Sequence, residues 1–200
     1  MQIKDRGKLW TNRAAALLLA AMLVFLFSGC SVNVKKQANG QDKQVDIDTP
    51  VGGIHVANEV NPEDVGIAIY PGAHLKEKDS NGSDKSANVN ISGFGFGLKV
   101  VALEYESNDA PAKVVDYYKD QLKKYGTVLV CHTSHLDVNT ETKDHDKESA
   151  SLTCEGSSGT NVELKVGTKQ NQHIVEVEPQ GKGSSFSLVF VRTHSKEAEI

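Results

Sequence analysis

The chain has 200 residues, of which 38% are hydrophobic and 6% aromatic, and its formal net charge is -4. Val, Leu and Ile are frequent after residue 43, which excludes wholesale disorder and predicts one domain of ordinary size. An acidic chain repels phosphate backbones, so the charge argues against nucleic-acid binding.

The first 29 residues have the pattern of an export signal. Five charged residues with a net charge of +3 precede an uncharged apolar run from Ala14 to Phe27: Lys4, Asp5, Arg6, Lys8 and Arg13. As a helix, this run would rise about 21 Å, less than the roughly 30 Å core of a bilayer. We therefore expect residues 1–29 to be a cleaved signal peptide, whose removal leaves a charge of -7.

The apolar run ends in Leu26-Phe27-Ser28-Gly29-Cys30, which resembles the lipobox of bacterial lipoproteins. Phe27 stands where that motif usually has Leu. The resemblance implies that Cys30 is acylated on its thiol and becomes the new amino terminus, which would hold the protein in a membrane of the bacterial cell envelope, facing the periplasm or the exterior. By analogy with enterobacterial lipoprotein sorting, Ser31 rather than Asp after the cysteine implies the outer membrane. An uncleaved signal anchor and ordinary secretion are the alternatives.

Residues 31–44 carry little apolar content and no period, so residues 30–44 are predicted to be the lipidated cysteine and a solvated tether. A single α+β domain is expected over residues 45–193, followed by a polar tail over 194–200. Its first elements are two short strands, around Val45 and Ile47 and around Ile54 and Val56, with a turn between them.

Two glycine-bearing segments follow. Tyr70-Pro71-Gly72-Ala73 suits a type II turn, because the third residue of that turn needs a positive φ. Residues 89–107 are predicted to form one long bent strand or two. In that strand Gly93, Gly95 and Gly97 would share one face, with Phe94 and Phe96 on the other.

The segment 107–126 predicts the helix of the domain. Asn108 or Asp109 can cap it, Pro111 lies in its first turn, and Gly126 ends it. Its apolar residues recur on one side and are expected to cover a sheet: Val114, Val115, Tyr118, Leu122 and Tyr125. A membrane-surface helix is the alternative, but the polar side carries both signs of charge.

The rest of the chain predicts strands. Residues 127–131 are continuously apolar, as in a central strand, and four alternating segments follow, around residues 150–154, 162–166, 175–177 and 186–190. We therefore predict an α+β fold in which one amphipathic helix packs on a mostly antiparallel sheet ending in a four-strand meander.

Cys131 and Cys154 remain as an even pair once Cys30 is assigned to lipid, and an exported protein meets an oxidising space. A disulfide between them is therefore expected, and the two cysteines could lie opposite one another if strands 127–131 and 149–154 are neighbours. Two buried free thiols are the alternative. The C-x-x-C spacing is absent, so redox catalysis and structural zinc lack their usual signature.

The turn at Tyr70-Pro71-Gly72-Ala73, the Phe-Gly strand and the helix with Tyr117-Tyr118 and Leu122 resemble an uncharacterised group of bacterial exported proteins. The resemblance covers roughly residues 45–130. It rests on turns and packing residues, so it implies an architecture and no activity.

The best candidate ligands for a metal ion are His132, His135, Asp137 and His145, which crowd one polar excursion. In an extended segment, His132 and His135 would point to opposite faces, so a solvated loop is the favoured interpretation. No G-x-S-x-G elbow is present, and Glu104 and Glu106 fit a solvent-facing strand end better than a glycosidase pair. The sequence predicts neither an enzyme nor a cofactor.

The functional prediction is a membrane-anchored envelope lipoprotein that serves as a protein-interaction or assembly module. Its partner would be an envelope protein bound at a sheet edge or at the glycine-bearing strand. The alternatives are a small-ligand or metal-binding lipoprotein that uses residues 132–145, and a hydrolase with a dispersed site. The oligomeric state is left open.

Overall fold

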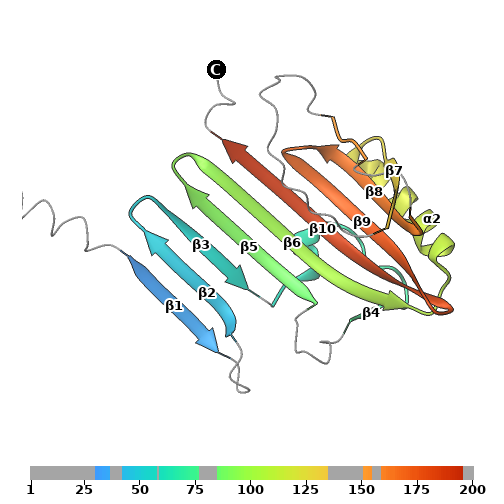
Figure 1. Cartoon of the computed structure of the whole chain (residues 1–200), viewed down its shortest axis with the longest axis horizontal. Coiled ribbons are helices and arrows are strands. Elements are labelled where there is room, and N and C mark those ends of the chain that lie inside the picture. The colour runs from blue at the N-terminus through green and yellow to red at the C-terminus, as the bar shows by residue number, and fades with distance from the viewer. Residues whose placement is uncertain are drawn as a thin grey trace, which may run out of the picture.

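The computed structural model of the chain describes residues 30–36, 42–57, 59–76, 85–134, 151–154 and 159–195. Its main feature is a 10-stranded antiparallel sheet with one α-helix, α2 (Pro111–Leu122), on one side of it (Figure 1). The predicted class, a mostly antiparallel sheet with one helix, is confirmed. The strands are β1 (Ser31–Lys36), β2 (Asp42–Thr49), β3 (Gly52–Ala57), β4 (His74–Leu75), β5 (Ser86–Gly93), β6 (Phe96–Ser107), β7 (Leu129–Thr133), β8 (Asn161–Thr168), β9 (Asn171–Gln180) and β10 (Gly183–Ser195).

The order of the strands across the sheet is β1-β2-β3-β5-β6-β10-β9-β8-β7, with the short β4 beside the end of β6. The two longest strands, β6 and β10, pair along their length at the middle of the sheet, from Phe96 with Ser195 to Ser107 with Ser184. Figure 1 shows α2 at the β8 and β9 side of the sheet, away from β1, β2 and β3.

The core lies between α2 and one half of the sheet. The helix buries Val114, Val115, Tyr118 and Leu122, the residues predicted from its period. They pack on alternate residues of β6, β8, β9 and β10, so the core also contains Val101, Leu103, Tyr105, Leu164, Val166, Val175, Val177, Phe186 and Leu188. The 3-10 turn η1 (Pro62–Val65) closes one side of this core with Val65, and a second turn, η2 (Lys123–Tyr125), extends α2.

The predicted turn at residues 70–73 is confirmed. Gly72 has a φ of 76°, and the Ala73 amide donates to the Tyr70 carbonyl over 3.0 Å. The predicted cap of α2 is wrong, because Ala110 is the N-cap and makes no side-chain bond. The Asp109 carboxylate instead accepts from the Tyr70 hydroxyl (2.9 Å) and from the Lys113 ammonium (2.9 Å), which ties the turn to the helix.

The glycine-bearing segment forms two strands rather than one. Phe94 and Gly95 are the two-residue turn between β5 and β6, with φ angles of 50° and 84°. The predicted division of glycines and phenylalanines between two faces is therefore wrong, because a turn interrupts the alternation. Gly97 is buried beside β10, where a Cβ would collide with the ring of His194.

The amino-terminal and carboxyl-terminal limits of the sheet differ from those predicted. Ser31–Lys36, predicted as part of a tether, is strand β1, because Val32 and Val34 alternate in register with Ile47 and Val45 of β2. At the other end, β10 continues to Ser195, two residues past the predicted end of the domain.

Two strand predictions in the second half are also wrong. The apolar run near Cys131 is β7, an edge strand by its place in the sheet order, not a central one. Residues 151–154 are not in a strand, and Ala150 lies outside the described residues. The position beside β7 is taken by β8, whose Glu163 pairs with Cys131. The strands β8, β9 and β10 are nevertheless consecutive antiparallel neighbours.

Candidate functional site

Cys30, the predicted lipidation site, is exposed and immediately precedes β1. Of the cysteines that the structure describes, Cys30 is the one that is not in a disulfide. The predicted signal peptide, residues 1–29, lies outside the part of the chain that the structure describes. In that described part, no helix combines the length and the apolar character needed to cross a membrane.

The predicted disulfide between Cys131 and Cys154 is confirmed, with the two Cα atoms 5.4 Å apart. Cys131 is 1% exposed and lies across from Glu163, on the side of the sheet opposite α2. The bridge thus holds residues 151–154 against that side of β7. The cysteine count predicted this pairing, whereas the strand geometry suggested for it is wrong, because residues 151–154 are not a strand beside β7.

Of the four candidate metal ligands, the structure describes His132, an exposed residue of β7. The other three, His135, Asp137 and His145, lie outside the described residues. Within the ranges that are described, no three His, Cys, Asp or Glu side chains are grouped in a way that could hold a metal ion.

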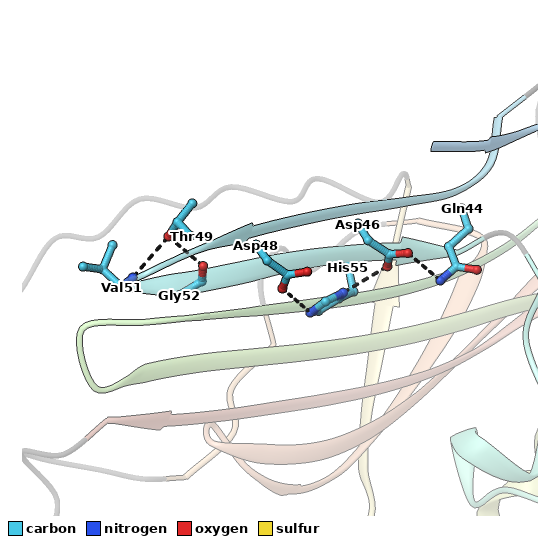
Figure 2. Close-up of polar contacts among 7 residues, drawn as sticks. All are labelled: Gln44, Asp46, Asp48, Thr49, Val51, Gly52 and His55. Atoms are coloured by element: carbon cyan, nitrogen blue, oxygen red, sulfur yellow. Dashed lines mark hydrogen bonds and ion pairs between the residues drawn. The ribbon is translucent and has the colours of Figure 1, made fainter. Parts of the chain in front are cut away.

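The β2–β3 hairpin carries a polar cluster that the sequence did not reveal (Figure 2). The His55 ring on β3 lies between two carboxylates of β2, with Nδ1 3.0 Å from Asp46 Oδ1 and Nε2 3.6 Å from Asp48 Oδ1. The Gln44 amide donates to the other oxygen of Asp46 over 2.8 Å. Residues two apart on a strand share a face, and the register places His55 opposite Asp46.

The two carboxylates of this cluster fix the orientation of the His55 ring. The hydrogen bond from His55, with a smaller effect of Gln44, lowers the pKa of the Asp46 carboxyl, so Asp46 stays ionised to a lower pH than an ordinary aspartate. Both ring nitrogens of His55 face a carboxylate, which leaves neither directed at a substrate. The cluster therefore supports the hairpin and does not have the arrangement of a general base.

The opposite side of the same strands is apolar. The register aligns two rows of side chains that run across the sheet from β1. The valine row is Val34, Val45, Val56, Val89, Val100 and Val191, and the isoleucine row is Val32, Ile47, Ile54, Ile91 and Leu98. Both rows lie on the side away from α2, because Val101 and Leu103, which alternate with them on β6, face the helix.

We call these two rows the apolar face. None of its residues is in the buried core, and Val32, Val34 and Ile54 are 67%, 41% and 39% exposed. Near the β2–β3 and β5–β6 turns the face is hollowed by about 230 Å³, between Ile47, Ile54 and Ile91 and under Val51 and Phe94. A contiguous apolar surface of this kind is typical of an interaction site.

The two turns beside this hollow are joined. The Phe94 amide donates to the Val51 carbonyl over 3.3 Å, and the Thr49 hydroxyl bonds to the Gly52 carbonyl (2.7 Å) inside the β2–β3 turn. A glycine at position 52 lets the two hairpins approach this closely, because a Cβ there would collide with the Ser92 carbonyl oxygen. The two turns therefore form one surface.

The comparisons with known proteins do not extend this description. Neither the family models, nor the curated proteins, nor the solved structures gave a match to this chain.

Proposed function

We propose that the chain is a lipid-anchored protein of a bacterial cell envelope that binds a segment of another protein at the β1 edge of its sheet. The observation that carries this proposal is that β1 is both the end of the strand order and the end of the apolar face. The occupant is an extended segment whose alternate side chains are apolar.

The edge supports this mode of binding in two ways. An edge strand offers a row of backbone donors and acceptors to a further strand. A strand added there would also continue both apolar rows, because Val32 and Val34 are exposed at their ends. Backbone bonds would supply affinity, and the two rows would select alternating apolar side chains.

The anchor rests on the resemblance of residues 26–30 to a lipobox. The position of Cys30 is compatible with it, since the thiol is exposed and belongs neither to a strand nor to the disulfide. Two or three acyl chains would hold the protein permanently in its membrane. The partner would then be a protein of the same envelope.

One experiment tests the proposal in cells. A photoreactive amino acid at Val32 should give one crosslinked product of constant mass, with the membrane fraction containing nearly all of it. Val34→Asp should reduce this product about tenfold, because a charge on the apolar face opposes burial of the added strand. Cys30→Ala should move the protein to the soluble fraction.

The matched control is Asn33→Asp, which places the same charge on the same strand but on its other face. This variant should keep the crosslinked product. Equal products from Asn33→Asp and Val34→Asp would contradict binding at the apolar edge. An unmodified Cys30 thiol in protein taken from the membrane would contradict the anchor.

A further inference from the structure

The strand register brings Cys30 and two hairpin turns to the same end of the sheet. Ser31 is level, strand by strand, with Asp48, Gly53, Ser92, Gly97 and His194. Cys30 lies one residue beyond this level, and the β2–β3 and β5–β6 turns lie two residues beyond it. Figure 1 shows the start of β1 and both turns at one end of the sheet, with the β9–β10 turn at the other.

This end of the sheet presents large apolar side chains to solvent. Phe94 is 91% exposed, Val51 53% and Phe96 46%. Phe94 is the most exposed of the large hydrophobic residues that the structure describes. The bond from the Phe94 amide to the Val51 carbonyl joins the two turns, and we call Val51, Phe94 and Phe96 at this end of the sheet the apolar tip.

The conformation of Phe94 makes its presence harder to explain by folding alone. Both turn residues have positive φ, which is the geometry of a type I′ turn, and Asn, Asp or Gly ordinarily occupies its first position. A phenylalanine there is strained by roughly 1 kcal/mol or more. Its side chain also gains almost no burial against the residues that the structure describes, since it is 91% exposed. Its side chain therefore fits a role outside the folded domain.

We infer that this tip, formed by Val51, Phe94 and Phe96, enters the surface of the membrane that holds Cys30. The inference rests on the proposed lipidation. No residue separates Cys30 from β1, so an acyl chain on Cys30 would hold this end of the sheet at the bilayer. Apolar and aromatic side chains at such a position bury their surface at the boundary between headgroups and acyl chains.

The charges behind the tip fit the same arrangement. Lys99 and Arg192 are register partners, three residues or about 10 Å back from Phe96 along β6, which is the depth of the headgroups when the tip is inserted. Both are cations that lipid phosphates attract. Two acids lie nearby: Asp46, at the register level of Lys99 and Arg192, and Asp48. Both face the His55 ring, at 3.0 Å and 3.6 Å.

Tryptophan fluorescence can test this inference, because the chain contains one tryptophan, Trp10, within the predicted signal peptide. The variant Phe94→Trp is purified from membranes, its acyl mass is confirmed, and it is reconstituted into phosphatidylethanolamine and phosphatidylglycerol vesicles. Lipids brominated near the headgroup should quench its emission about twofold, with a shift to shorter wavelength, as expected for a residue at the interface.

The matched control is Lys182→Trp, an exposed site in the turn between β9 and β10 at the far end of the sheet. Its emission should not respond to brominated lipid. If the acylated Phe94→Trp variant is quenched no more than this control, the tip does not enter the bilayer, while the anchor stands. If the purified protein carries no acyl mass, both the proposed anchor and this inference are overturned.

Discussion

The Glu176 carboxylate on β9 is buried, although glutamate side chains are ordinarily ionised and exposed to solvent. The residue is 3% exposed; its Oε1 atom accepts from Asn161 (3.3 Å) and Thr133 (3.4 Å), and its Oε2 atom is buried with no hydrogen-bond partner among the described residues. Burial, with smaller effects of Glu178 and Glu163, raises the pKa of Glu176. A group with a raised carboxyl pKa makes folding less favourable as the pH rises, because the folded state holds the proton longer.

We therefore expect Glu176→Gln to stabilise the protein at pH 7. The amide keeps an acceptor for Asn161 and removes the buried charge, so the free energy of unfolding should rise by about 1 kcal/mol. The gain should shrink as the pH falls through the raised pKa of the folded state, and it should vanish only below the unfolded pKa of about 4.3, where the wild-type carboxyl is neutral in both states. Urea unfolding at pH 7 and pH 4 measures both values.

The exposed Asp116 on α2 provides the control, since Asp116→Asn removes a charge of the same sign without changing a buried site. It should leave the free energy of unfolding within about 0.5 kcal/mol of the wild type at either pH. A Glu176→Gln variant that is less stable at pH 7 than at pH 4, each relative to wild type, would refute the assignment of the penalty to the buried charge.

Single residues were predicted unevenly from the sequence. Gly72 and the buried side of α2 were predicted, because turn geometry and helical period depend on neighbours in sequence. The partner of Asp109, the burial of Glu176 and the position of His55 between two aspartates depend on strand pairing. A register is not visible in one strand, so the Asp46 and His55 contact could not be foreseen.

Among the elements, α2 is the one that closes the core. Leu122 in its last turn is 0% exposed and packs in the cluster formed with β8, β9 and β10. The helix has no side-chain N-cap, so its stability comes mainly from this packing. The 3-10 turn η2 continues the chain from Lys123 to Tyr125.

The substitution Leu122→Ala should therefore lower the free energy of unfolding by about 3 kcal/mol, within the range for fully buried leucines. Chemical unfolding followed by circular dichroism measures it. Asp116→Ala, on the exposed side of the same helix, should change the value by less than about 0.5 kcal/mol. Similar losses in both variants would mean that helix propensity, not burial, decides the stability of α2.

The strands show how far alternation predicts an element. The segments around Val45, Ile54, Val162 and Val175 are strands as predicted, since period 2 is a local signal. Alternation around Leu152 did not produce a strand, because β8 occupies the place beside β7. The turn at Phe94 was missed because a phenylalanine is unusual at positive φ.

At the scale of the whole molecule, the two halves of the sheet carry their apolar residues on opposite sides, and the change of side occurs at β6. Val101 faces the core with α2, whereas its neighbour Val100 belongs to the valine row on the opposite side. The helix covers the half of the sheet formed by β6, β10, β9, β8 and β7. The other half, formed by β1, β2, β3 and β5, exposes the apolar face in the described structure. The sequence predicted the alternation of apolar residues along each strand. It did not predict which of the two alternating sets of side chains faces the helix, because only strand pairing aligns these sets between neighbouring strands.

The disulfide also acts at this scale, since it joins two cysteines that are 23 residues apart in sequence. Replacing both cysteines, Cys131→Ser with Cys154→Ser, should lower the free energy of unfolding by about 3 kcal/mol, as expected for a closed loop of this length. Urea unfolding measures the loss. Reduction of the wild type should give the same midpoint as the double variant, and a reduced protein as stable as the oxidised one would show that the bridge adds nothing.

The length of β6 has a geometric consequence. Its 12 residues extend about 40 Å, and their first end lies at the level of Cys30. If that end enters a lipid leaflet as far as Lys99, the strands stand upright on it, and the loop between β9 and β10 lies about 30 Å above the headgroups. The length of the strands would then set the distance from its own leaflet at which the protein can contact another structure.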